Sequence, residues 1–521
     1  MSTRILRRKR IDLQTTAIIG AGAAGLAAAI ALAARGQRVV VLEKAPYPGG
    51  KMRRIAVEGD AIDAGPTVFT MKWAFDELFD RAGLSLDDFV TCRKAEVLAR
   101  HWWPADGALD LFADPARSAQ KIAAFSDDRN AAGYLRFVDD SAAIFRTLQR
   151  SYIAAVRPGP LDLVARIGPF ALRDMLALRP LSTLWSALGD YFPDDRLRQL
   201  FARYATYCGS SPFLAPATLM LVAHVEQDGV WMVEGGMHAL AMGLADAARR
   251  LGAEIRYDAQ VVRIDADPDG VTGLTLAGGE RVSADSVIFN GDVSALAGGE
   301  LGKLDTGLPP VARRERSLSA VTWALRGDVG DYPLAHHNVF FCDDYRAEFD
   351  AIFAQGKMPN APTAYICAQD RGDDGQLARG GGEERLFCLV NAPANGDENP
   401  YPEREVERCL QNTTAHLARC GLDLPMATAK VTTPADFHRL FPGTGGALYG
   451  RASHGWMASF RRSGARTRIP GLYMAGGSVH PGPGVPMAVI SGSLAAESLV
   501  SDRGSMRRFR PAAISGGMLT E

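Results

Sequence analysis

The hydrophobic positions near the start of the chain form unbroken apolar runs. Residues 16–19 are apolar and end at Gly20, and residues 23–34 are rich in alanine and leucine. A strand buried on both faces reads as a continuous apolar run, whereas alanine and leucine favour a helix. Residues 38–42 (Arg-Val-Val-Val-Leu) form another such run. The pattern predicts a strand, a helix and a second strand of a parallel sheet.

The same hydropathy has a second interpretation. Residues 17–34 carry no charge and follow a basic stretch at 4–10, as in a signal peptide or a membrane span. The regularly spaced glycines and the polar gap at 12–16 favour the buried strand and helix.

The predicted secondary structure changes from mainly helical to mainly strand-like along the rest of the chain. Residues 71–225 show mainly helical patterns, and strand-like runs alternate with Gly, Asp and Pro loops between 300 and 430. Such alternation is typical of an antiparallel sheet. A last strand is predicted at 472–475, followed by a helix rich in small residues at 485–496.

Composition narrows the class of protein. The 521 residues carry a net charge of −1, with 47% hydrophobic and 22% charged residues. These values indicate a folded chain of two or three domains without a nucleic-acid partner. Seven scattered cysteines without a CxxC pair indicate reduced thiols, not a disulfide framework or structural zinc. His336 and His337 lack metal-ligand spacing, so we expect a solvated loop there and no metal site.

Three glycines follow the first predicted strand. Gly20 permits a tight turn, Gly22 lets the backbone approach a pyrophosphate, and Gly25 lets the helix pack closely on the strand. The free N–H groups at the helix N-terminus favour phosphate. Glu43 ends the second strand, where a carboxylate can accept a hydrogen bond from a ribose hydroxyl. The order of these features predicts a dinucleotide site.

A second glycine-rich motif lies near the end of the chain. The strand at 472–475 runs into Gly476 and Gly477, and the stiff turn at 481–484 precedes the helix that begins at Val485. This arrangement places another helix N-terminus at the cofactor. Both ends of the chain are therefore expected to close around one dinucleotide.

Three motifs carry a family resemblance. Glu43-Lys44, Gly49-Gly50-Lys51 and the run Asp-Ala-Gly-Pro-Thr at 63–67 resemble the flavin-binding amine oxidase and phytoene desaturase superfamily. The resemblance implies FAD in preference to NAD. It also implies that the backbone near Val262 meets the adenine. The cofactor-binding residues expected from the motifs and the resemblance are Gly20, Gly22, Ala24, Gly25, Glu43, Lys44, Gly50, Lys51, Pro66, Thr67, Val262, Gly476, Gly477, Gly484, Val485, Pro486 and Met487.

The resemblance also implies an α/β fold: a Rossmann-like FAD-binding domain with a discontinuous, mixed α+β substrate domain. The FAD-binding domain is expected at 1–70, 226–295 and 431–505. A helical, membrane-facing region at 71–225, a substrate-domain sheet at 296–430 and a tail at 506–521 complete the division.

Within the superfamily, the terminal motif resembles the phytoene desaturase (carotenoid desaturase) family. Many flavin oxidoreductases carry an acid where this chain has Gly477, and carotenoid desaturases typically do not. The variant at 478–481 (Ser-Val-His-Pro) is most similar to desaturases that introduce the 3,4 double bond into 1-hydroxy carotenoids such as hydroxyneurosporene. Phytoene desaturation and carotenoid isomerisation stay open as alternatives. So do a flavin amine oxidase and a non-catalytic lipid escort.

The segment 161–192 interleaves arginines with apolar and aromatic residues. It is either a helix packed on the core or an amphipathic segment on a membrane surface. The resemblance favours a cytoplasmic enzyme bound peripherally to the inner membrane, with an acyclic carotenoid as substrate and oxygen or a quinone as electron acceptor. It also makes Arg173 and Asp174 the candidate catalytic pair, against a surface salt link. His480, inside the terminal motif, is expected to serve packing rather than catalysis.

Overall fold

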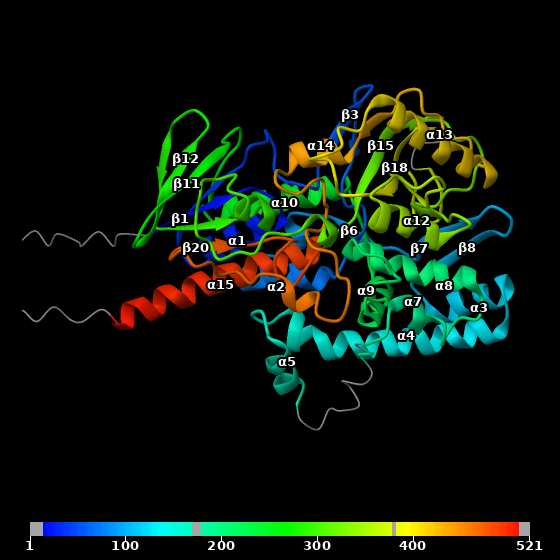
Figure 1. Ribbon diagram of the computed structural model, residues 1–521, viewed down its shortest axis with the longest axis horizontal. Helices are drawn as coiled ribbons and strands as arrows, with labels where there is room; N and C mark the ends of the chain where they lie inside the picture. The colour runs from blue at the N-terminus through cyan, green and yellow to red at the C-terminus, as the bar shows by residue number, and fades with distance from the viewer. Residues whose placement is uncertain (1–13, 169–177, 180, 378–381, 510–521) are drawn as a thin grey trace, which may run out of the picture.

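The computed structural model describes residues 14–168, 178–179, 181–377 and 382–509 (Figure 1). Its first sheet has five parallel strands in the order β10-β2-β1-β14-β20. The chain therefore returns to this sheet three times from distant parts of the sequence. The strands are β1 (Thr15–Ile19), β2 (Arg38–Leu42), β10 (Glu254–Arg256), β14 (Ser286–Phe289) and β20 (Leu472–Met474).

Helix α1 (Ala23–Ala33) packs on this sheet and is buried along nearly its whole length. A helix that is apolar on all sides is stable only when it is enclosed. Its neighbours α2 (Lys72–Arg81), α10 (Met237–Arg250) and α15 (Val485–Phe509) enclose it (Figure 1). The uncharged N-terminal stretch is thus a buried strand and helix, as predicted, and not a membrane span.

Small antiparallel elements flank the parallel sheet. A three-stranded sheet projects from the body at one end of the molecule (Figure 1). Its strands are β11 (Val261–Asp267), β12 (Gly270–Leu276) and β13 (Arg281–Ser283). The other small elements are the hairpin of β3 (Arg54–Val57) and β4 (Asp60–Asp63), and the sheet of β5 (Phe69–Thr70), β9 (Val230–Val233) and β6 (Cys92–Lys94).

A seven-stranded sheet forms the second body, in the order β19-β15-β18-β17-β16-β7-β8. Neighbouring strands are antiparallel except for the parallel pair β16 and β7. The strands are β7 (Val97–Trp103), β8 (Gly107–Phe112), β15 (Ser319–Gly327), β16 (His337–Phe340), β17 (Ala364–Ala368), β18 (Glu384–Ala392) and β19 (Lys430–Thr432). Three helices accompany it: α12 (Tyr345–Asp350), α13 (Glu403–Arg419) and α14 (Pro434–Leu440).

The helical region is less uniform than its sequence pattern suggests, because strands β7 and β8 come from it. Burial along β7 largely alternates, which is the period of a strand with two different faces. The helices of this region and its surroundings are α3 (Pro115–Phe125), α4 (Asp128–Leu148), α5 (Pro160–Ile167), α7 (Leu184–Leu188), α8 (Asp195–Ala202), α9 (Leu221–Asp228) and α11 (Val293–Ala297). Among the residues that the structure describes, no helix is long and apolar enough to cross a bilayer.

The α/β fold with a Rossmann-like parallel sheet and a separate mixed α+β body agrees with the fold class predicted from the sequence. All seven cysteines are free thiols, as expected.

Candidate cofactor and substrate site

The first glycine motif forms a turn that only glycine fits at two positions. Gly20 has a φ of +98°, a conformation that favours glycine. A Cβ atom on Gly25 would lie 2.1 Å from the Gly20 carbonyl oxygen. Gly22 caps helix α1 without a side-chain hydrogen bond, and the first turn contains no acidic residue. The N–H groups at this helix end are therefore free to bind an anion.

Asn290 joins the two glycine motifs and was missed by the sequence reasoning. It directly follows β14, and its Nδ2 donates to the Gly20 carbonyl oxygen at 3.2 Å. Its side chain also lies 3.3 Å from the Cβ position of Gly476. Its position in the sequence was a usable signal, because Asn290 follows a predicted strand and ligands bind at the carboxyl ends of strands in open parallel sheets.

The predicted ribose-binding acid holds the glycine turn. The buried Glu43 accepts from the backbone N–H groups of Ala21 at 2.6 Å and Ala45 at 2.9 Å. Gly49 donates to the Ala21 carbonyl at 2.8 Å, and a Cβ on Gly50 would lie 3.3 Å from Gly22 Cα. The second glycine pair thus lies against the first motif, as the resemblance implies.

Lys44 and Lys51 connect the first motif to the segment that leads into the last one. Their Nζ atoms donate to the carbonyl oxygens of Leu440 and Leu448, each at 2.5 Å. Burial lowers the pKa of both ammonium groups. In this structure both lysines hold chain segments in place through backbone carbonyls.

The terminal motif follows β20 directly. The Gly476 N–H donates to Ser491 Oγ of helix α15 at 3.2 Å. Gly476 and Gly484 both have positive φ, +132° and +114°. Helix α15 then begins at Val485, with Pro486 and Met487 in its first turn, which holds no acidic residue. A second helix N-terminus suited to an anion therefore lies at this edge of the sheet.

The two helices that start at the glycine motifs are in direct contact. A Cβ atom on Gly492 of α15 would lie 2.1 Å from the Ala24 carbonyl oxygen of α1. Gly492 is seven residues from the start of α15, or about 10 Å at 1.5 Å per residue. The first turn of α15 therefore lies well away from the point where α15 contacts α1. This separation of the two helix N-termini suits an extended dinucleotide better than a single phosphate.

Arg462 is a buried cation beside the terminal motif. Its guanidinium donates to the carbonyl oxygens of Gly477 and Tyr449 at 3.2 Å each and of Arg451 at 2.6 Å. Within the described part of the chain, no carboxylate lies at ion-pair distance from it, and burial lowers its pKa. Nothing in the local sequence marks this arginine. The free helix ends, the glycine cradle and this cation fit a bound FAD.

The remaining predicted contacts are spread more widely. Val262 lies where the β11–β12 register shifts between Val261 and Arg263, and its side chain is 40% exposed. Thr67 follows Pro66, and its Oγ1 lies 2.6 Å from the hydroxyl of Tyr365 on β17. Thr67 therefore links the cofactor side to the seven-stranded sheet.

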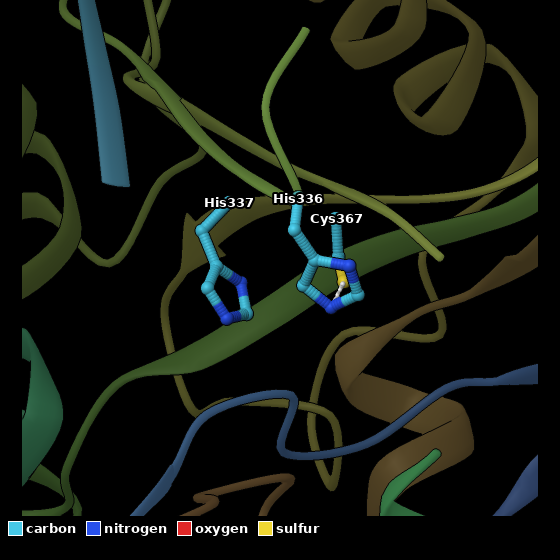
Figure 2. Close-up of side chains that lie close together, drawn as sticks. All are labelled: His336, His337 and Cys367. Atoms are coloured by element: carbon cyan, nitrogen blue, oxygen red, sulfur yellow. Dashed lines mark hydrogen bonds between the residues drawn. The ribbon is translucent and has the colours of Figure 1, made fainter. Parts of the chain in front are cut away.

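The expectation of a solvated His336–His337 loop is wrong. His337 begins β16 and is buried, His336 is half-buried, and both lie beside Cys367 of β17 (Figure 2). Their potential ligand atoms lie within 4.8 Å of one another. His336 Nε2 is 3.5 Å from the Cys367 sulfur, and burial raises the thiol pKa to about 12. The geometry could hold a metal ion, but the high pKa favours a neutral thiol hydrogen-bonded to an imidazole.

His480 packs, as expected. Its ring contacts Tyr152 edge-on at 4.8 Å, and its Nε2–H donates to the Ala155 carbonyl at 2.9 Å. Burial lowers its pKa to about 4, so the ring is neutral at pH 7. The candidate catalytic pair Arg173 and Asp174 lies outside the described residues.

Comparison with known proteins identifies the family. The model of the flavin containing amine oxidoreductases matches residues 23–500. The chain belongs to this family. Like other members of this family, it is an FAD-dependent oxidoreductase, and the predicted cofactor is confirmed.

Two relatives and one solved structure refine the likeness. The chain is 49% identical over 512 residues to a hydroxyneurosporene desaturase of Rubrivivax gelatinosus, covering 96% of each protein. It is 30% identical to a 1-hydroxycarotenoid 3,4-desaturase of a Flavobacterium species, covering 92% of this chain and 98% of the relative. The crystal structure of an oxidoreductase from Methanosarcina mazei matches with a TM-score of 0.60 and 16% identity, over 94% of this chain and 100% of the other. The last likeness supports the fold alone.

Proposed function

We propose that this oxidoreductase desaturates an acyclic carotenoid during carotenoid biosynthesis, introducing the 3,4 double bond into a 1-hydroxy carotenoid such as hydroxyneurosporene. The observation that carries the proposal is the 49% identity to a hydroxyneurosporene desaturase over 96% of both chains. Phytoene desaturation and isomerisation are less well supported. The glycine at position 477 in place of an acid also speaks against an amine oxidase.

Bound FAD supplies the two-electron acceptor for such a reaction. The protein supplies binding and orientation: the first turns of α1 and α15 face the dinucleotide, and Gly22, Gly50, Gly477 and Gly484 let the backbone approach it. These residues and the others predicted for cofactor binding are part of the proposal. The neighbouring face of the seven-stranded sheet would exclude water from the reacting polyene.

The proposal includes a membrane surface as the source of the substrate. Two leucines of the arginine-rich segment are left in solvent: Leu161 of α5 is 84% exposed, and Leu181, just before α7, is 87% exposed. Two exposed arginines, Arg157 and Arg166, lie beside and within α5. Apolar and basic side chains presented together suit an interface with anionic lipid. Helix α5 also lies at the periphery of the molecule (Figure 1).

The decisive experiment supplies purified, FAD-loaded protein with one carotenoid at a time and records absorption spectra. We expect a red-shifted product from 1-hydroxyneurosporene. A red-shifted product only from phytoene would refute the 3,4-desaturation. A spectral change without the loss of two hydrogens in the mass spectrum would indicate isomerisation. Release of hydrogen peroxide when amines are added would indicate an amine oxidase. Failure of the protein to hold flavin would indicate a lipid escort. Repeating the assay with a quinone or with oxygen identifies the electron acceptor.

A further inference from the structure

A buried ionic cluster connects the helical region to the seven-stranded sheet. Arg203 begins the 3₁₀ turn after α8, and Glu226 lies in α9. The carboxylate of Glu226 accepts hydrogen bonds from the hydroxyls of Tyr204, at 2.7 Å, and Tyr207. Arg203 donates through Nη1 to the Tyr207 hydroxyl at 3.0 Å, and its Nη2 lies 3.5 Å from Glu226 Oε1. Arg203 is only 8% exposed and Glu226 only 3%.

The cluster is incomplete as a hydrogen-bonded unit. Arg203 Nε and Nη2 are buried and have no hydrogen-bond partner in the described structure. A buried donor without an acceptor destabilises the fold, and more so when it is charged. Buried charged groups without full pairing cluster at functional sites, where a bound group can complete the pairing. The free N–H groups of Arg203 therefore indicate an oxygen acceptor that comes from outside the protein.

The charge of Arg203 reaches side chains that are linked to a residue expected at the cofactor. His337 and His101 lie on the adjacent strands β16 and β7. Burial is the main cause that lowers the pKa of both imidazoles, and the charge of Arg203 contributes to it. His337 Nδ1 is 2.7 Å from the Tyr365 hydroxyl, which is itself 2.6 Å from Thr67 Oγ1, and Thr67 is one of the residues expected at the cofactor.

The chemistry of a 3,4-desaturation demands a polar group in such a place. In a 1-hydroxy carotenoid, the carbon that bears the hydroxyl is separated from C4 by three bonds of about 1.5 Å each, so they are at most about 4.5 Å apart. When C3 and C4 lie at the flavin, the hydroxyl must be buried beside it. A buried hydroxyl without partners would weaken binding by about 5- to 100-fold.

We propose that Arg203 and Glu226, with Tyr207, recognise the tertiary hydroxyl group of the substrate. A free N–H of Arg203 donates to the hydroxyl oxygen, and the Glu226 carboxylate accepts a hydrogen bond from the hydroxyl group. The proposal rests on the proposed function and deepens it, because it makes this cluster the determinant that separates hydroxylated polyenes from plain ones.

The test compares hydroxyneurosporene with the same polyene lacking the hydroxyl. A site built to hydrogen-bond a hydroxyl discriminates by about 10⁴-fold in kcat/KM, whereas an apolar pocket manages at most about 10²-fold. In the double variant Arg203→Met/Glu226→Met, both charges are lost together, so no unpaired charge stays buried. We expect its preference to fall by about 100-fold or more relative to wild type, with FAD still bound. Tyr207→Phe serves as a milder second variant, with a smaller fall in the same direction.

A matched control is available at the seven-stranded sheet. Arg371, after β17, and Glu384, the first residue of β18, form another buried ion pair, with Nη2 and Oε1 at 2.6 Å. Arg371→Met/Glu384→Met should keep the wild-type preference. An unchanged preference in both the Arg203/Glu226 double variant and Tyr207→Phe would overturn the proposal.

Binding of each polyene, followed by quenching of protein fluorescence, separates this proposal from the proposed function. If the wild-type protein desaturates neither polyene, the proposed function fails. The ratio of the two dissociation constants then tests the hydroxyl site independently of catalysis. Tighter binding of the hydroxylated polyene that is lost in the double variant supports the hydroxyl site. Equal binding of the two polyenes by the wild-type protein refutes it.

Discussion

The close contact between α1 and α15 can be tested by replacing one hydrogen atom with a methyl group. In Gly492→Ala the new Cβ would lie 2.1 Å from the Ala24 carbonyl oxygen and 3.0 Å from Ala27 Cβ. The first neighbour is backbone and cannot rotate away. The closest ordinary contact of a Cβ atom is about 3.4 Å, so the helices must separate locally by about 1.3 Å.

Overpacking of this kind costs about 1–3 kcal/mol. Because the proposed cofactor site places the N-termini of both helices at the dinucleotide, we expect the cost to be divided between a lower free energy of unfolding and weaker FAD binding. If about 1.4 kcal/mol of this cost weakened FAD binding, the affinity for FAD would drop about tenfold.

The control lies in the same helix. Gly504 of α15 is exposed, and a Cβ there meets no atom within 4 Å. Gly504→Ala should be neutral or should stabilise the protein by up to about 1 kcal/mol. Urea unfolding of the flavin-free protein and FAD titration by flavin fluorescence measure the two quantities. If Gly492→Ala matched Gly504→Ala in both, the inferred role of the helix contact would be refuted.

Four further outcomes follow from the structure. Glu43→Gln leaves one backbone N–H of the glycine turn without an acceptor, so FAD should bind about tenfold more weakly or worse, whereas the exposed Glu58→Gln should bind it normally. His480 is buried, and its pKa is lowered from 6.5 to about 4. As the pH falls, this imidazole is therefore protonated in the unfolded chain before it is protonated in the folded protein. About 3 kcal/mol of the free energy of unfolding that is present above pH 6.5 is lost as the pH falls to 4. Urea titrations of His480→Gln should show a shallower loss over that range, and an equal loss would contradict the assignment. Leu161→Glu/Leu181→Glu should reduce flotation with anionic vesicles, while the exposed Val431→Glu in β19 should not; equal binding of all three proteins would exclude α5 as the contact. Protein grown with added zinc should carry no stoichiometric metal, because the Cys367 thiol stays protonated; bound zinc that is lost in Cys367→Ser would prove this wrong.

The local parts of the cofactor site could be predicted because their cause is local. Gly20 and Gly25 need glycine for reasons within one turn, and the spacing to Glu43 is fixed by one helix and one strand. Asn290 was missed although it follows a predicted strand, because its contact with Gly20 joins residues 270 positions apart and no pattern in a single sequence encodes that pairing. Arg462 was missed although its partners Tyr449, Arg451 and Gly477 lie within fifteen residues of it, because they are backbone carbonyls, which leave no mark in the sequence.

The same reason explains the errors in the second body. His336 and His337 sit in a polar loop context, but tertiary pairing of β16 with β17 buries His337. Strands β7 and β8 lie within a region read as helical. They pair with each other as a local hairpin, and the strand that joins this hairpin to the sheet, β16, lies more than two hundred residues later. The Arg203–Glu226 cluster likewise assembles from the 3₁₀ turn after α8 and from α9, neither of which carries a recognisable motif.

The glycine at position 477 has a physical meaning beyond family likeness. Unlike Gly476, it is not among the positive-φ glycines, and a Cβ there would come no closer than 3.7 Å to another atom, Pro483 Cα. The fold therefore does not require glycine, and a carboxylate could be accommodated. Such a carboxylate would lie beside Arg462, whose guanidinium already donates to the Gly477 carbonyl. Without it, the buried guanidinium has no carboxylate at ion-pair distance among the described residues, and Asp292 is the acid whose charge acts on it from further away. A cation in that position would favour negative charge on the bound dinucleotide, so under the proposed function the missing acid leaves Arg462 to the cofactor.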